Sequence, residues 1–431
     1  MDCDVAIIGA GAAGLAAAGT LTRAAFHVRS LEATNRIGGR VFTVHDPLAP
    51  GAIELGAEFV HGRPPEIWDL IRTNRLMAYE HTGHARYMDR GRILASEEIG
   101  DTADRVLSKI AKSKRRKDES FEDFLHRSRQ KANLKDWARI YIEKDWARIY
   151  IEGFNACRAD QVSVLSLRQD GEAADKIDGD RAFRIVGGYD SIVSLLAQPS
   201  VELNSVVEQV RWTRGHVEVR YRSILDGQQA RLQCRQLIVT VPLGVLQAGT
   251  ILFDPEPAGI LKAARSLQFG QVYRVTLRFR EAFWEENEAL RDVRFIVSKD
   301  NRFRTWWTTH PLVSPLLTGW IAGTAAEGFQ PADSETVASE AIASLSRILG
   351  RKVPRPEAFY FHDWRSDPFF RGAYSYVPVN ALPAKEILAK PVEKTLYFAG
   401  EAAELNGHGG TVHGAIASGL RAAALVQQGA K

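Results

Sequence analysis

The hydrophobic positions at the start of the chain predict a strand, a helix and a second strand. Residues 5–8 form an uninterrupted apolar run, and residues 15–21 have the composition of a helix. A short apolar run of this kind is typical of a parallel strand that is buried on both faces. A second strand-like run follows at residues 28–31. Together the three segments predict the βαβ arrangement of an α/β protein.

Hydrophobic patterns further along the chain predict more strands and two long helices. We expect an amphipathic helix at residues 333–349 and an alanine-rich helix from residue 412 onward, whereas residues 64–200 are mainly helical and polar. The predicted strands are residues 201–210, 216–221, 236–241, 274–279, 295–297, 319–322 and 396–399. A strand, a glycine-rich turn and a helix at the end of the chain indicate a return to the domain in which the chain starts.

A glycine motif joins the first strand to the first helix. Gly9 permits a tight turn, Gly11 lets backbone approach a pyrophosphate, and Gly14 lets the helix pack closely on the strand. Ala13 lies in the same turn, and Glu32, which follows the second strand, can accept hydrogen bonds from a ribose. The phosphates would face the unpaired N–H groups at the helix N-terminus. The sequence therefore predicts a dinucleotide site.

The residues after Glu32 indicate which dinucleotide is bound. A second glycine–arginine loop contains Arg36, Gly39 and Arg40, and residues 54–58 follow it. A nicotinamide dinucleotide needs no such loop. The pyrophosphate of FAD gains from an added guanidinium, and its ribityl chain needs close backbone approach. We therefore predict FAD; the alternative is a surface turn with solvated arginines.

The composition is typical of a soluble globular protein, with 45% hydrophobic and 25% charged residues. The net charge of +4 is too small to indicate nucleic acid, and the basic segment at residues 109–117 is typical of a solvated face. The cysteines, Cys3, Cys157 and Cys234, are widely spaced, which argues against a disulfide framework or a metal site. We find no signal peptide and no apolar run near the roughly 20 residues of a spanning helix. We expect a cytoplasmic protein with no metal, nucleic acid or membrane partner.

A segment of nine residues occurs twice in succession, at residues 135–143 and 144–152. Nine residues turn a helix by about two and a half turns, so the two copies face opposite sides. We expect one copy to be packed and the other to be looped or exposed, and we assign no function to the repeat.

Many ordered motifs make the chain resemble the FAD-dependent amine oxidases, a family that includes monoamine oxidases, polyamine oxidases and histone lysine demethylases. The resemblance runs nearly end to end and is weakest at residues 80–180. Besides the N-terminal glycine motif, it depends on residues 36–40, 54–62, 203–207, 241–246, 362–368, 371–376, 398–401 and 410–415.

The resemblance implies an α/β fold in two domains. One is a discontinuous Rossmann-like FAD-binding domain, made of residues 1–78, 184–262 and 386–431. The other is an inserted substrate domain with a mixed sheet and helices, made of residues 79–183 and 263–385.

The resemblance also implies how the cofactor is held. Ala373 occupies the place of the cysteine that bonds the flavin in monoamine oxidases, so we expect noncovalent FAD. The resemblance implies further contacts with the cofactor besides those of the glycine motif and Arg36. On the adenosine side they are Glu32 at the ribose, Val207 at the adenine, and Gly39 and Arg40 at the pyrophosphate. On the flavin side they are Gly400 and Glu401 at the ribityl chain, Thr411 and Val412 at the isoalloxazine, and Gly56, Ala57 and Glu58 beside the flavin.

An aromatic cage that holds the amine before the flavin is implied as well. Tyr374 matches one wall of this cage, Thr411 takes the second cage position, and Trp364 supports the flavin or the cage floor. His61 matches an active-site histidine of animal polyamine oxidases and could bond an amine; alternatively it is a core histidine that donates to backbone. For Trp306, Trp307 and Trp320 we expect packing within the sheet rather than a place in the cavity.

Arg274 departs from the family pattern, because it stands where relatives carry a lysine that holds a water at flavin N5. Arginine keeps the charge but does not lose a proton near neutral pH. Reactivity with oxygen is therefore in question, and Arg274 could instead clamp a substrate carboxylate.

We expect oxidation of a primary or secondary amine, a polyamine or a monoamine, to an imine. A hydride would pass to flavin N5, and O2 would reoxidise the flavin and yield H2O2. The alternatives are an L-amino acid oxidase, an amine dehydrogenase or another FAD oxidoreductase with a different acceptor, and a noncatalytic FAD-binding protein that docks through residues 109–117. The sequence names neither the amine nor the oligomeric state.

Overall fold

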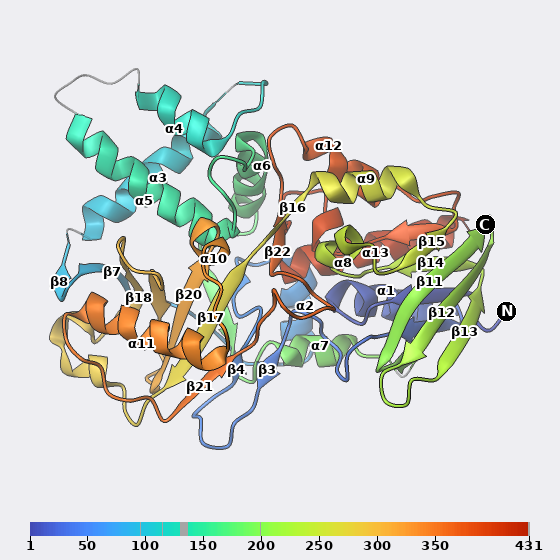
Figure 1. Ribbon diagram of the computed structural model, residues 1–431, viewed down its shortest axis with the longest axis horizontal. Helices are drawn as coiled ribbons and strands as arrows, with labels where there is room; N and C mark the ends of the chain where they lie inside the picture. Colours follow the sequence, from blue (N-terminus) through green and yellow to red (C-terminus); the bar gives the residue numbers. More distant parts are fainter. Residues whose placement is uncertain (95, 114, 130–136, 199, 430–431) are drawn as a thin grey trace.

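The structure is a computed structural model that describes residues 1–94, 96–113, 115–129, 137–198 and 200–429. The chain forms two halves side by side, and both termini lie in the same half (Figure 1). The half with the termini contains a five-stranded parallel sheet, and the other contains a seven-stranded mixed sheet. This arrangement confirms the predicted α/β class with a discontinuous Rossmann-like domain, while the domain boundaries stay a prediction.

The first strand, β1 (Val5–Ile8), lies in the middle of the parallel sheet and is buried on both faces. Val5 and Ile7 pack against helices α1 (Ala12–Arg23) and α13 (Val412–Gly429). Ala6 and Ile8 pack on the other face, against an antiparallel sheet. Burial on both faces explains why the run is apolar without alternation. The strand order is β10 (Val201–Glu202), β2 (Val28–Leu31), β1, β14 (Gln236–Val239) and β23 (Leu396–Phe398).

The predicted hairpin at residues 201–221 is confirmed, although its first strand begins later than expected. It pairs β11 (Ser205–Thr213) with β12 (His216–Ser223). The sheet continues with β13 (Gln229–Cys234) on one side and β15 (Leu252–Asp254) on the other. Helices α8 (Leu243–Ala248), α9 (Ala258–Ser266) and α12 (Leu382–Ala389) complete this half.

An inner strand of the seven-stranded sheet, β17 (Val272–Arg278), is buried along its whole length. Its residues Tyr273, Val275 and Leu277 pack under α11 (Ser334–Leu349). The residues that alternate with these three along the strand, including Arg274, therefore face the other side of the sheet, away from α11. The strand order is β21 (Ala358–Phe361), β17, β20 (Leu316–Ala322), β19 (Thr305–Trp307), β18 (Val293–Val297), β7 (His84–Asp89) and β8 (Arg92–Ile93).

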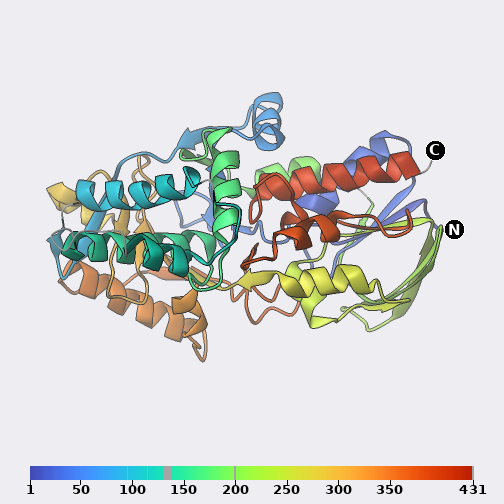
Figure 2. The same cartoon turned by 90° about the horizontal axis from the view of Figure 1, so that it is seen from above.

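The polar segment after residue 64 is mainly helical, as predicted, but it also contains strands that the pattern did not reveal. Seen from above, α3 and α5 lie on the side of the seven-stranded sheet opposite α11 (Figure 2). The helices are α2 (Pro65–Thr73), α3 (Ser96–Ala111), α4 (Phe121–Arg129), α5 (Trp137–Asn155), α6 (Val164–Asp175) and α7 (Asp190–Leu196). The additional strands are β6 (Ala78–Glu80) and β9 (Ala182–Ile185), besides β7 and β8, and β9 also pairs with β5 (Val60–His61), which lies just before this segment.

The duplicated segment lies in one helix, so the first copy is not looped, and its exposure stays a prediction. The second copy is packed, as expected, since Trp146 and Ile151 are buried. Helix α5 contains the whole second copy and residues 137–143 of the first copy. Residues 135 and 136 lie outside the described part of the chain. In the basic segment at residues 109–117, Arg115, Arg116 and Lys117 are exposed, and Lys114 lies outside the described residues. No helix among the described residues is both long and apolar enough to cross a membrane.

Candidate active site

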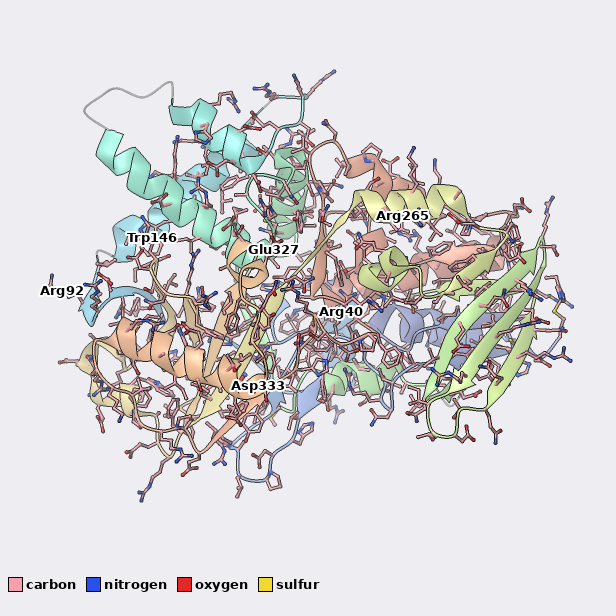
Figure 3. All side chains as sticks on the ribbon, viewed as in Figure 1. Arg40, Arg92, Trp146, Arg265, Glu327 and Asp333 are labelled. Carbon is pink, nitrogen blue, oxygen red and sulfur yellow. The ribbon has the colours of Figure 1, made fainter. Side chains whose placement is uncertain are left out.

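A cavity of about 850 Å³ runs between the two halves of the molecule. Its lining contains residues of β1, α1 and β11 from one half and of β17, β19 and α5 from the other. Arg40, which lies at the centre of the molecule where the halves meet (Figure 3), is part of this lining. The volume lies within the range of about 300–1,000 Å³ of small-molecule and cofactor sites.

The glycine motif builds one end of the cavity. Gly9 has φ +102°, a conformation that favours glycine. A Cβ on Gly14 would stand 2.0 Å from the carbonyl oxygen of Gly9, so only glycine lets α1 start this close to the strand. A Cβ on Gly11, by contrast, would meet no protein atom closer than 4.0 Å. Protein atoms therefore leave room over Gly11, where a pyrophosphate would approach the backbone.

Glu32 lies at the same end of the cavity. Its Oε2 accepts a hydrogen bond from the backbone N–H of Ala10 at 2.7 Å, and its Oε1 accepts from the N–H and hydroxyl of Thr34 at 2.9 and 2.8 Å. Each carboxylate oxygen has two lone pairs, so Oε2, which accepts one hydrogen bond here, can still accept from a ribose hydroxyl. Val207, on β11 beside a β-bulge, also lines this end.

The two arginines of the second loop have different surroundings. Arg40 lines the cavity and donates from Nη1 to the carbonyl of Ala373 at 2.7 Å and to Glu401 Oε1 at 2.8 Å. Arg36 is not among the cavity-lining residues. Its Nη1 donates to the carbonyls of Ile37 and Val41, and its guanidinium lies 3.9 Å from the ring centre of Phe42. These contacts hold the loop rather than a ligand.

Glu401 joins three chain segments at the middle of the cavity. Besides Arg40, its carboxylate accepts from the hydroxyl of Ser375 at 2.6 Å and from the N–H of Gly410 at 3.0 Å. Burial alone would raise the pKa of Glu401, but Arg40 and these donors lower it below its ordinary value. Thr411 caps α13 by accepting from the N–H of Gly414 at 3.0 Å. The first N–H groups of α13 thus open into the cavity, where they favour negative charge.

The fit between these residues and FAD is good. The cavity has phosphate-directed backbone at one end and a helix N-terminus at the other, with Arg40 and Glu401 between them. Of the residues predicted to bind the cofactor, those that line the cavity are Gly9, Gly11, Ala13, Glu32, Gly39, Arg40, Gly56, Ala57, Glu58, Val207, Gly400, Glu401, Thr411 and Val412. Gly14 and Arg36 shape its backbone.

The residues predicted to act on the amine, namely Arg274, Tyr374, His61, Trp364 and Thr411, all line this cavity. The hydroxyl of Tyr374 donates to the carbonyl of Phe154 at 2.8 Å, and its ring lies 3.3 Å from where a Cβ on Gly410 would stand. Trp364 donates from Nε1 to the carbonyl of Leu55 at 2.8 Å. One atom of its ring stands 3.1 Å from the position of a Cβ on Gly56, which places Trp364 beneath the flavin-side backbone.

His61 has the surroundings of a ligand-facing histidine. Its ring contacts Phe154 edge to face at 5.4 Å, and no hydrogen bond to another described residue is present. Burial lowers the pKa of His61 to about 4, so the imidazole is neutral at neutral pH. This environment favours the first of the two roles predicted for His61.

Aromatic side chains that the sequence left unassigned line the cavity as well. Trp146, Tyr150 and Phe154 come from α5, so the second copy of the duplicated segment contributes to the wall. The sequence assigned no function to the repeat, and the structure places this copy in the cavity wall. The expectation for the sheet tryptophans holds only for Trp306, because Trp307 and Trp320 line the cavity.

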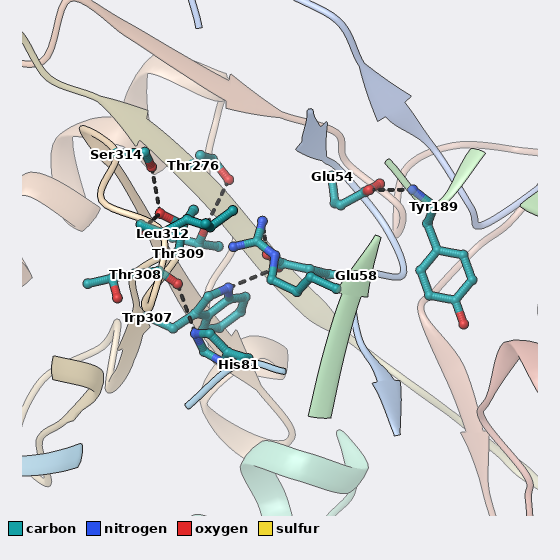
Figure 4. A network of polar contacts seen from close by, with 12 residues as sticks. Glu54, Glu58, His81, Tyr189, Thr276, Trp307, Thr308, Thr309, Leu312 and Ser314 are labelled. Carbon is teal, nitrogen blue, oxygen red and sulfur yellow. Dashed lines mark hydrogen bonds and ion pairs between the residues drawn. The ribbon is translucent and has the colours of Figure 1, made fainter. Parts of the chain in front are cut away.

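Arg274 belongs to a buried ion cluster that the sequence did not predict (Figure 4 shows the polar contacts around Glu58). It donates from Nη2 to Glu58 Oε2 at 2.6 Å and from Nη1 to the carbonyl of Gly56 at 2.7 Å. Arg184 lies 2.6 Å from Glu58 Oε1, and Trp307 donates to Oε2 at 2.9 Å. Although burial alone would raise the pKa of Glu58, the two guanidiniums lower it. Glu58 therefore already supplies the carboxylate that Arg274 pairs with.

Comparisons with known proteins agree with this site. The chain is 29% identical to "Lysine-specific histone demethylase 1 homolog 2" of Oryza sativa subsp. japonica over 98% of its own length, but it spans only 56% of that relative. It is 30% identical to "Polyamine oxidase 5" of the same organism, covering 97% of this chain and 86% of the relative.

Solved structures share the fold. A wild-type putrescine oxidase bound to putrescine has a TM-score of 0.79 at 24% identity, covering 99% of both chains. Cyclohexylamine oxidase from Brevibacterium oxydans IH-35A has a TM-score of 0.79 at 19% identity, covering 100% of both chains. These likenesses confirm the predicted two-domain arrangement.

A family model described as "Flavin containing amine oxidoreductase" matches residues 12–427. FAD is the cofactor, and it is held without a covalent bond, in agreement with the methyl side chain predicted to face it at Ala373. The chain belongs to the family of flavin-containing amine oxidoreductases.

Proposed function

We propose that the protein oxidises a primary or secondary amine to an imine, with O2 as the electron acceptor and H2O2 as the second product. The observation that carries this proposal is the position of Tyr374. Its ring lines the same cavity as the FAD cradle and lies beside Gly410, directly before the N-terminus of α13. Relatives named as polyamine oxidases support a polyamine or monoamine substrate.

When bound, FAD supplies the hydride acceptor, and the protein binds, orients and desolvates the amine. The faces of Tyr374 and the tryptophans of the wall attract an ammonium group and exclude water from the carbon to be oxidised. The neutral imidazole of His61 can accept a hydrogen bond from the amine. Thr411 and Val412 place the N-terminus of α13 where negative charge develops, and this end of the helix stabilises it.

The contacts of Arg274 help to distinguish amine oxidation from the alternative functions. An L-amino acid oxidase needs a cation free to take the substrate carboxylate, whereas Arg274 is paired with Glu58 and Gly56. Nothing in these contacts favours that alternative. The replacement of lysine by arginine keeps a dehydrogenase with another acceptor as the second candidate.

An anaerobic panel of amines and α-amino acids tests the proposal. We expect amines, but not simple α-amino acids, to bleach the oxidised flavin band. Oxygen added afterwards should restore the band and yield peroxide in equal amount. Bleaching by α-amino acids alone, or by no compound, contradicts amine oxidation. Bleaching without restoration by oxygen contradicts the oxidase and supports a dehydrogenase.

A further inference from the structure

A buried lysine lies in the wall of the cavity without a direct partner among the residues that the structure describes. Lys385 is 6% exposed and belongs to the face of α12 that also buries Ala384 and Leu388. Its Nζ lies 3.1 Å from where a Cβ on Gly409 would stand. Within the described part of the chain, no hydrogen bond and no ion pair within 4.0 Å reaches this ammonium. Burial of an ammonium is costly unless acceptors replace the lost water.

An aspartate with few partners lines the same cavity. Asp170 lies on α6, and its neighbours on that helix, Ser166 and Leu167, also line the cavity. The hydroxyl of Ser166 donates to Asp170 Oδ2 at 3.4 Å, a long hydrogen bond. Burial raises the pKa of Asp170 to about 7, although the charge of Lys385 and the Ser166 hydrogen bond lower it. Asp170 and Lys385 therefore influence each other without forming a direct ion pair.

The other acid that acts on Asp170 is already satisfied. Glu404 is buried, and its oxygens accept from the N–H groups of Asn406 at 2.6 Å and His408 at 2.7 Å. Its charge further raises the pKa of Asp170. It does not line the cavity, so it holds the loop before α13. Asp170 and Lys385 remain as the acidic and the basic side chain that open toward a ligand here.

We propose that Asp170 and Lys385 form a distal subsite for the α-amino acid head group of a substrate whose other end carries the amine to be oxidised. Lys385 donates to the carboxylate, and Asp170 accepts from the α-ammonium. A head group with both charges satisfies both side chains, whereas a diamine leaves Lys385 without an acceptor. This inference rests on the proposed function, because it assumes that the far amine is oxidised beside the aromatic cage.

Four ligands that carry the amine on a chain of the same length distinguish the contact between Lys385 and the carboxylate from the contact between Asp170 and the α-ammonium. L-lysine carries both head-group charges, 1,5-diaminopentane lacks the carboxylate, 6-aminohexanoate lacks the α-ammonium, and pentylamine lacks both. L-ornithine and its three counterparts repeat the comparison with one carbon fewer. The rate of anaerobic flavin reduction at rising ligand concentration gives an apparent Kd separately from the limiting rate constant.

In the wild type we expect the complete amino acid of one of the two series to bind most tightly. Asp170→Asn should weaken it about tenfold or more and leave the ω-amino acid unchanged. Lys385→Met should weaken the amino acid and the ω-amino acid to a similar degree and spare the diamine. The controls Asp175→Asn and Lys390→Met change exposed charges at the ends of the same two helices and should change no affinity.

Binding of L-norleucine gives a readout that needs no turnover, because this ligand has the head group and no second amine. We expect it to perturb the spectrum of the oxidised flavin and raise the Tm of the holoprotein, and both variants should lose these effects. Equal affinities within both series, or bleaching of the flavin by norleucine, overturn the distal subsite. If amines reduce the flavin without a head-group preference, the distal subsite fails and the proposed function stands. If norleucine binds in the expected manner but no amine reduces the flavin, the proposed function fails.

Should Lys385→Met or Asp170→Asn lose FAD, Lys385→Arg and Asp170→Glu take their place. These variants keep the charges and should keep the order of affinities within each series. The wild-type affinities and the norleucine titration also decide the question without any variant.

Discussion

Removal of the central charge of the buried ion cluster should destabilise the protein strongly. The side chains of Glu58, Arg274 and Arg184 are 2%, 4% and 11% exposed, so water cannot replace the carboxylate. Glu58→Gln keeps the shape of the side chain but leaves two buried guanidiniums without a counterion. Breaking a buried pair in this way costs about 3–5 kcal/mol.

The expected change in Tm follows from the size of the chain. An unfolding entropy of about 2.1 cal/mol/K per residue over 431 residues gives roughly 0.9 kcal/mol/K, so Tm should fall by about 3–6 °C. The measurement is thermal and urea unfolding of the holoprotein. The control is Glu340→Gln, which breaks an exposed ion pair with Arg347 and should cost less than about 1 kcal/mol. Equal losses for both variants would refute the assigned role of the cluster.

The pH dependence of this difference gives an independent check. The folded-state pKa of Glu58 lies below its ordinary value of 4.5. Its ionisation therefore contributes stability above pH 4.5, which is lost as the pH falls through the lower folded-state pKa. The stability difference between wild type and Glu58→Gln should be constant near neutral pH and shrink only in acid. A difference that shrinks already near pH 7 would contradict the ion-pair account.

Three further substitutions test the cofactor cradle and the amine side. Gly56→Ala places a Cβ 2.0 Å from the carbonyl oxygen of Arg40, so the purified protein should lose most of its FAD, measured as the ratio of flavin to protein absorbance. Full FAD content would refute the tight approach. Burial lowers the pKa of His61 to about 4, so anaerobic flavin reduction in His61→Gln should keep the wild-type pH profile between about pH 6 and 8. A wild-type transition near 6.5 that the variant loses would contradict a neutral His61. Arg274→Lys should raise the rate of peroxide production, and an unchanged rate would show that our account of this position is wrong.

Local patterns in the sequence were sufficient to predict the dinucleotide end of the site. Gly9, Gly14 and Glu32 lie within 24 consecutive residues, and the strand and helix between them follow from hydrophobic periodicity. Close approach of backbone to a ligand dictates the residue type there, so the motif is visible without any tertiary contact. The same reasoning explains why strands buried on both faces, such as β14 and β23, were predicted close to their true positions.

The substrate side was less predictable because its residues meet only in the folded chain. One face of helix α5 lines the cavity. The sequence pattern of the repeat does not reveal which face this is. The strands β5, β6 and β8 carry too few residues for a period of two to stand out, and the six residues of β7 do not alternate between buried and exposed. Asp170 and Lys385 look like ordinary surface charges on helices, and only the burial of Lys385 and the position of both beside the cavity distinguish them.

Arg274 illustrates how tertiary contacts change the meaning of a residue. The sequence predicts a permanent cation on a strand, which suggests an anchor for a substrate carboxylate. The fold brings Glu58, 216 residues away in sequence, into contact with it. A guanidinium that already holds a carboxylate gains little from a second one, whereas the ammonium of Lys385 has no such partner within the described residues. If the substrate carries a carboxylate, the unsatisfied cation is therefore the better recognition group, and that cation lies away from β17.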